Sequence, residues 1–141
     1  MNTNKILVAG IAGGLTFFLL GWLFYGMLLM DFMTANSSGI AGLHKDPMVM
    51  WALIVGNLSW GFLFAVILGC WSGDLTLGKA AARGAIIGLL TAINVDMVMF
   101  ATTNVTTLTC VAVDVATVTV MGAIGAAVIT AVLNWGKKAT V

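Results

Sequence analysis

Two aspartates, Asp96 and Asp114, are the residues of this chain whose type and position most strongly indicate chemistry. Both belong to the stretch NVDMVMFATTNVTTLTCVAVD, which joins the last two apolar segments of the sequence. A carboxylate at membrane depth is energetically expensive, so such a residue is by default a candidate for a functional site. The rest of the chain can then be treated as the scaffold that holds this pair.

The two aspartates are expected at the same depth on neighbouring helices. Asp96 precedes the end of the third apolar segment by about six residues, and Asp114 follows the start of the fourth by about five. At a rise of about 1.5 Å per residue, both carboxylates lie roughly 8–9 Å below one membrane boundary. Two ionised carboxylates so close would repel, so we expect a shared proton or a bridging cation. The alternative is that each aspartate reaches interfacial water and binds nothing.

Other polar side chains are expected to line an outward-facing pocket around the pair, between the first, third and fourth spans, and to bind a small ligand, a proton or a cation. These side chains are Tyr25, Asn57, Asn94 and Thr117. Thr117 follows Asp114 by three residues and therefore shares its helical face. Two of the four have alternative interpretations. Tyr25 could anchor the first span at the interface together with Trp22, and Asn57 could bond across helices as structural glue.

The composition requires a membrane to position these groups. The chain has 141 residues, of which 61% are hydrophobic and 8% charged, against about 25% charged in a soluble domain. We predict an all-α integral membrane four-helix bundle in a single domain, 1–141, with spans at about 6–30, 48–71, 80–102 and 109–135. The fourth segment begins rich in valine and threonine, but an open sheet is not available in lipid, so it is predicted to be helical.

The connections predict the orientation of the bundle. Residues 31–46 are predicted to form a loop, followed by a helix with Asp46 as its N-cap and Pro47 at its first position. Five of the six basic residues fall on one side of the predicted membrane, and only Lys45 falls on the other. The five are Lys5, Lys79, Arg83, Lys137 and Lys138. The positive-inside rule then places both termini in the cytoplasm.

Glycines spaced four apart predict close helix contacts. Gly10 and Gly14 form one such pair, Gly84 and Gly88 form another, and GAIGAA begins at Gly122. These faces exceed what one small bundle needs internally, so we predict a homo-oligomer. Beyond the lipid bilayer, other membrane proteins are the alternative partners, and no basic patch for nucleic acid is present.

Signals for enzymes and cofactors are weak. The sequence contains no glutamate, and it lacks the CxxC, HExxH and GxSxG motifs, so we predict a non-enzymatic protein with no implied cofactor. Methionines gather in the outer half, and thioether and imidazole ligands suit Cu(I). Met27, Met30 and His44 are the weak metal candidates, although methionine is also an ordinary apolar filler.

The sequence resembles a family of small four-span bacterial membrane proteins of unknown function. The segments that carry the resemblance are GGLTFFLLGWLFYG in the first span, LGKAAARGAIIGLL in the third and MGAIGAAV in the fourth. The resemblance implies a location in the bacterial inner membrane and supplies no activity. The leading hypothesis is therefore a ligand-, proton- or cation-binding membrane protein. The alternatives are an accessory subunit of a membrane assembly and Cu(I) handling.

Overall fold

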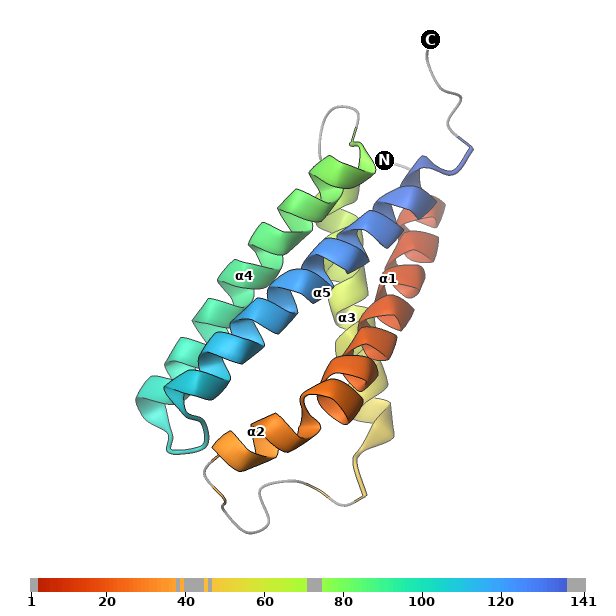
Figure 1. Cartoon of the computed structure of the whole chain (residues 1–141). Coiled ribbons are helices and arrows are strands. Elements are labelled where there is room, and N and C mark those ends of the chain that lie inside the picture. The colour runs from red at the N-terminus through yellow and green to blue at the C-terminus, as the bar shows by residue number, and fades with distance from the viewer. Residues whose placement is uncertain (1–2, 38, 40–44, 46, 71–74, 137–141) are drawn as a thin grey trace.

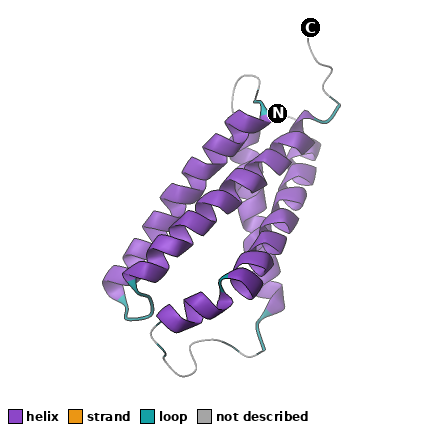
Figure 2. Ribbon diagram, viewed as in Figure 1, coloured by secondary structure: helices purple, strands orange, loops and turns teal. Residues whose placement is uncertain are grey.

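The computed structural model describes residues 3–37, 39, 45, 47–70 and 75–136, and its regular elements are all helical (Figure 2). In chain order they are α1 (Thr3–Leu23), the π-helical turn η1 (Phe24–Leu28), α2 (Met30–Asn36), α3 (Met50–Cys70), α4 (Leu77–Thr102) and α5 (Leu108–Asn134). Threonine side chains cap the last two helices, because Thr76 accepts from the Lys79 amide and Thr107 accepts from the Cys110 amide.

Four helical segments are long and apolar enough to cross a membrane: Thr3–Leu28, Met50–Cys70, Leu77–Thr102 and Leu108–Asn134. The shortest has 21 residues, which corresponds to about 31 Å of helix against about 30 Å of hydrocarbon. Most of the residues in each segment are not buried inside the bundle and are apolar. The prediction of an all-α, four-span membrane bundle is confirmed, and the valine- and threonine-rich start of α5 is helical.

The bundle is built around α5. This helix packs along most of α4 and also contacts α1 and α3, while α1 and α3 form the second extensive pair (Figure 1). The described chain starts and ends at one end of the bundle, which we call the terminal end. The short helix α2 lies across the opposite end, which we call the α2 end (Figure 1). The two ends differ in how tightly the helices meet.

Small residues bring α4 and α5 into backbone contact. The buried positions of α4 recur every four residues: Ala80, Gly84, Gly88 and Ala92. A methyl group added at Gly84 would overlap the carbonyl oxygen of Gly122 and the side chain of Ala126, and one added at Gly88 would meet the Val118 carbonyl oxygen at 2.6 Å. Only glycine permits this approach, as in other close membrane helix pairs.

A second close contact joins α1 to α3. A methyl group at Gly61 would overlap the backbone of Gly10 and Gly14, and one at Gly14 would lie 2.8 Å from the Leu58 Cα. Beside this contact Phe17 is 2% exposed, and its ring packs edge-on against that of Phe64, with 5.1 Å between the centroids. The glycine faces are therefore used inside the protomer, which removes the reasoning behind the predicted homo-oligomer.

Side-chain hydrogen bonds tie each end of the bundle. At the terminal end the Lys5 ammonium donates to the carbonyl of Trp135 at 2.9 Å, and the Asn134 amide donates to the carbonyl of Leu75 at 2.9 Å. At the α2 end the Thr107 hydroxyl donates to the carbonyl of Asn36, also at 2.9 Å. This last bond fixes the end of α2 against the turn between α4 and α5.

Two expectations for the first connection need correction. Residues 31–46 were predicted to be a loop, but Asp31 through Asn36 belong to α2. Pro47 does not begin the next helix, because α3 starts at Met50. Asp46, the predicted N-cap, lies outside the described residues.

Candidate functional site

Tyr25 and Asp114 form the central contact of the candidate site. The Tyr25 hydroxyl donates to Asp114 Oδ1 at 2.6 Å, and the bond joins the first span to the fourth. Tyr25 lies in η1, where the helix of the first span changes to π-helical geometry before the chain bends at Leu29. A π-helical turn inserted in an α-helix redirects side chains and is frequent at functional sites.

Asp96 completes the group from α4. The carboxyl groups of Asp96 and Asp114 lie within hydrogen-bonding range of each other, and Asp96 is also close enough to act electrostatically on Tyr25. Asp96 Oδ2 is buried and has no hydrogen-bond donor among the described residues. Ionised carboxylates only accept hydrogen bonds, so a bond between these two groups requires a proton on one of them.

The helix register explains why the two aspartates meet. Gly84 lies against Ala126 and Gly88 lies against Gly122, so four residues forward along α4 match four residues back along α5. Asp96 lies eight residues after Gly88 on α4, and Asp114 lies eight residues before Gly122 on α5. The stripe of small residues thus ends in the carboxylate pair. Each aspartate is six residues from the α2 end of its helix, or about 9 Å, so the predicted matched depth agrees with the helix bounds.

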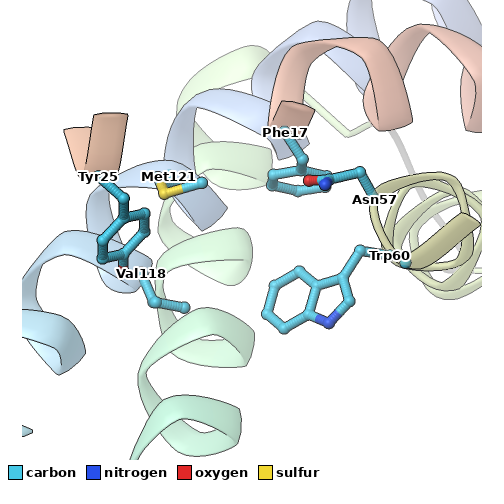
Figure 3. Close-up of a pocket in the computed structure, with 7 residues that line it drawn as sticks. Phe17, Tyr25, Asn57, Trp60, Val118 and Met121 are labelled. Carbon is cyan, nitrogen blue, oxygen red and sulfur yellow. The ribbon is translucent and has the colours of Figure 1, made fainter. Parts of the chain in front are cut away.

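A cavity of about 260 Å³ adjoins Tyr25 on the side of α3. Its lining residues are Phe17, Tyr25, Gly56, Asn57, Trp60, Val118 and Met121. Figure 3 shows Tyr25 and Val118 on one side of this space and Trp60 on the other. These residues come from the first, second and fourth spans, whereas the sequence predicted a pocket between the first, third and fourth. The carboxylate pair and the cavity are separate features that share Tyr25.

The remaining predicted site residues lie in different places. Asn57 lines the cavity, and its amide nitrogen donates to the carbonyl of Leu53 in its own helix at 2.8 Å. Thr117 is buried and donates to the carbonyl of Val113 at 2.8 Å. Asn94 is exposed on α4 and makes no hydrogen bond within the described part of the chain. The structure therefore groups Tyr25, the aspartates and, across the cavity, Asn57.

Of the three metal candidates, the structure describes Met27 and Met30. Met27 and Met30 are 58% and 55% exposed on the outside of the bundle, and His44 lies outside the described residues. No cluster of three or more histidine, cysteine, aspartate or glutamate residues occurs in the part of the chain that the structure describes. The described geometry offers no support for a Cu(I) site.

Phe17 and Trp60 are cavity residues that sequence reasoning did not identify. Their rings pack edge-on, with centroids 5.5 Å apart, and they form one wall of the cavity. Their sequence context is that of ordinary apolar spans, so residue type alone gave no signal. The Asn57–Trp60 spacing of three residues, which places both on one face of α3, was the available clue.

Comparison with known proteins identifies no relative. No family model matches the chain, and neither a curated protein nor a solved structure matches it. The resemblance to a small bacterial four-span family therefore gains no support, and the function must be argued from the site itself.

Proposed function

We propose that this four-span membrane protein binds and releases a proton at the Asp96–Asp114 pair, in the half of the bilayer that faces away from the cytoplasm. By the positive-inside rule, the distribution of basic residues favours a cytoplasmic terminal end. The α2 end, with the carboxylate pair, then faces outward. A bacterial inner membrane suits this orientation.

The observation that carries the proposal is the hydrogen-bond arrangement of the three side chains. Asp114 receives the only proton that Tyr25 can donate, at 2.6 Å. Asp96 Oδ2 has no donor within the described chain, and the nearby Asp114 carboxyl group offers a second acceptor. One proton shared between the carboxyl groups gives every buried oxygen of the pair a favourable neighbour and leaves a single negative charge instead of two.

Infrared spectroscopy of the purified protein tests the proposal. A protonated carboxyl group absorbs at a higher C=O stretching frequency than a carboxylate, so a titration in sodium-free buffer should show such a band at neutral pH. We expect Asp96→Asn to abolish this band, because the new amide can donate to Asp114 in place of the shared proton. Asp31→Asn, on exposed α2, is the matched control and should leave the band unchanged.

Two results would overturn the proton assignment. The first is a wild-type spectrum with no protonated carboxyl band at neutral pH. The second is a band that survives in the double variant Asp96→Asn with Asp114→Asn. If the band is present in sodium-free buffer and disappears when sodium chloride is added, the pair binds an inorganic cation in preference to a proton.

A second candidate, an accessory subunit of a membrane assembly, is favoured by Asn94. Its amide is exposed on an apolar helix and unbonded within the described residues, and such amides in lipid usually bond to another helix. Extraction in mild detergent should then recover a bound membrane protein, or a second copy of this chain. Asn94→Leu should release it, whereas Val95→Leu, at a neighbouring exposed position, should not.

A further inference from the structure

We propose that the cavity beside Tyr25 binds a small organic ammonium ion, and that its binding releases the proton of the carboxylate pair. This inference rests on the proposed proton site and adds the class of ligand that would be exchanged for the proton. Four features of the cavity lead to it: its hydrogen-bonding groups, its aromatic walls, its charge and its size.

The two polar groups of the lining present acceptors to the cavity. The Tyr25 hydroxyl gives its proton to Asp114, so only the lone pairs of its oxygen remain available. The Asn57 amide nitrogen donates one of its two hydrogens to the carbonyl of Leu53, and the side-chain carbonyl oxygen is available as an acceptor. In Figure 3 the indole nitrogen of Trp60 lies on the side of the ring away from Tyr25. A ligand that donates hydrogen bonds can therefore pair with both the Tyr25 oxygen and the Asn57 carbonyl oxygen.

The walls and the local charge favour a cation. Three of the seven lining residues are aromatic, and aromatic faces attract ammonium groups by about 0.5–2 kcal/mol. No lysine or arginine is among the lining residues, while Asp114 is hydrogen-bonded to one of them. A positively charged hydrogen-bond donor suits both the acceptor atoms of the lining and its aromatic, negatively charged surroundings.

The dimensions limit the ligand to a small molecule. The cavity volume of about 260 Å³ lies just below the roughly 300–1,000 Å³ of pockets for drug-sized ligands. Gly56 forms part of its wall, and a methyl group added there would meet no atom within 4 Å. A larger side chain can therefore be introduced at this wall position, to reduce the cavity, without disturbing the helix contacts.

The link to the proton follows from the position of Tyr25 between cavity and carboxylates. A cation against the Tyr25 ring favours the doubly ionised pair, so ligand and proton compete for the same negative charge. Affinity should rise as pH rises through the titration of the pair, with up to one proton released per ligand bound. In the described chain, the titratable groups nearest the pair along its own and the bonded elements are Tyr25 of η1, which bonds to Asp114, and the buried Cys110, four residues before Asp114 in α5. Helix α3 places only Cys70 among its titratable residues, at the terminal end, and Asp31 of α2 is exposed.

Isothermal titration of the full chain in nanodiscs tests the inference, with benzylammonium as the probe and benzyl alcohol as its uncharged counterpart. Repeating the titration in buffers of different ionisation enthalpy counts the protons released. We expect the wild type to bind benzylammonium at least about tenfold more tightly than benzyl alcohol. Gly56→Leu should abolish binding by filling the cavity. Asp96→Asn should retain binding but lose proton release.

Each other outcome contradicts a different part of the inference. Equal binding of benzyl alcohol, or unchanged binding in Gly56→Leu, would overturn the ammonium site and leave the infrared evidence for the proton pair intact. Binding without proton release, in a protein that shows the carboxyl band, would overturn the coupling. Absence of the band would overturn the proposed function itself, even if benzylammonium still bound in the cavity. Gly78→Leu, which also meets no atom within 4 Å at its Cβ position, is the matched control.

Discussion

The two halves of this bundle use the same helices in different ways. Toward the terminal end, glycine and alanine bring α4 against α5, and Gly61 of α3 meets the glycines of α1 near the middle of the bundle. Toward the α2 end, the same helices carry aspartates, a π-helical turn and an aromatic cavity. Close packing at one end thus coincides with polar groups and open volume at the other.

The two halves of α4 and α5 have different roles: one half fixes how the helices pack, and the other carries the polar side chains. Backbones in direct contact cannot slide past one another, because interiors are close-packed and rearrange only in discrete steps. The Gly84–Ala126 and Gly88–Gly122 contacts therefore set the register that brings Asp96 to Asp114. A polar site in lipid needs such fixed support, since its groups lack water to compensate for a misplaced partner.

The largest effect should come from Gly61→Ala. The added methyl group would overlap the backbone of Gly10 and Gly14, which cannot move aside as a flexible side chain would. We expect a loss of about 1–3 kcal/mol in the free energy of unfolding, the usual range for overpacking. Thermal or denaturant unfolding in detergent, followed by circular dichroism, measures it.

Gly56→Ala is the control in the same helix, because its Cβ position is open. It should be neutral or slightly stabilising, since alanine is the better helix former by up to about 1 kcal/mol. If Gly61→Ala and Gly56→Ala destabilised the protein equally, α3 would not be packed more tightly at Gly61 than at Gly56.

The next effect is expected from Tyr25→Phe. This change keeps the ring that lines the cavity and removes the hydroxyl that bonds to Asp114. Hydrogen bonds in membrane proteins average about 0.6 kcal/mol and reach about 1.7 kcal/mol, and a charged acceptor favours the upper part of this range. Unfolding of Tyr25→Phe, Asp114→Asn and the double variant gives the coupling energy. A coupling near zero would contradict a bond that holds the first span to the fourth.

Much of this architecture could be predicted from sequence because it depends on length, hydropathy and helical periodicity. The four spans follow from long apolar segments, and the matched depth of Asp96 and Asp114 follows from counting residues back from the last connection. The face of α4 that meets α5 could also be predicted from the sequence. The small residues of α4 recur every four positions, and Asp96 occupies the next position of that series. The contacts of Gly84 with Ala126 and of Gly88 with Gly122 show that α5 carries a matching series of small residues.

Other features depend on geometry that periodicity does not contain. Asn94 was grouped with Asp96, yet residues two apart on a helix do not face the same side, and Asn94 is exposed. The π-helical turn has no known sequence signal here, and it decides where Tyr25 points. The cavity lies between the first, second and fourth spans because α5 is central and α4 packs extensively only on α5.

A smaller effect should separate the two helix caps. Thr76 and Thr107 each accept a hydrogen bond from an amide three residues later, but only Thr107 also donates to Asn36 of α2. Replacing either with alanine should lower stability by about 1 kcal/mol, the typical cost of a lost cap. Hydrogen exchange in α2 should increase only for Thr107→Ala. Equal exchange in both variants would show that this bond does not hold α2 in place.

The smallest effect is expected from Asn94→Leu in the isolated protomer. The amide is exposed and makes no hydrogen bond within the described chain, so its loss should change the unfolding free energy by no more than about 0.5 kcal/mol. A larger loss at high protein concentration, absent on dilution in detergent, would reveal a partner helix at this position. Dilution series by analytical ultracentrifugation distinguish the two cases.

The carboxylate pair also bears on how the chain enters the bilayer during synthesis. An aspartate opposes translocon-mediated insertion of a lone helix, by about 2.5–3.5 kcal/mol at the helix centre and by less toward an end, and α4 and α5 each carry one six residues from an end. Their small-residue stripes match, and only residues 103–107 separate the two helices, so they are suited to leave the translocon as a preformed hairpin. In that hairpin the proposed shared proton would remove one of the two charges before lipid surrounds them. The contact that would titrate in the mature protein would then also ease its biogenesis.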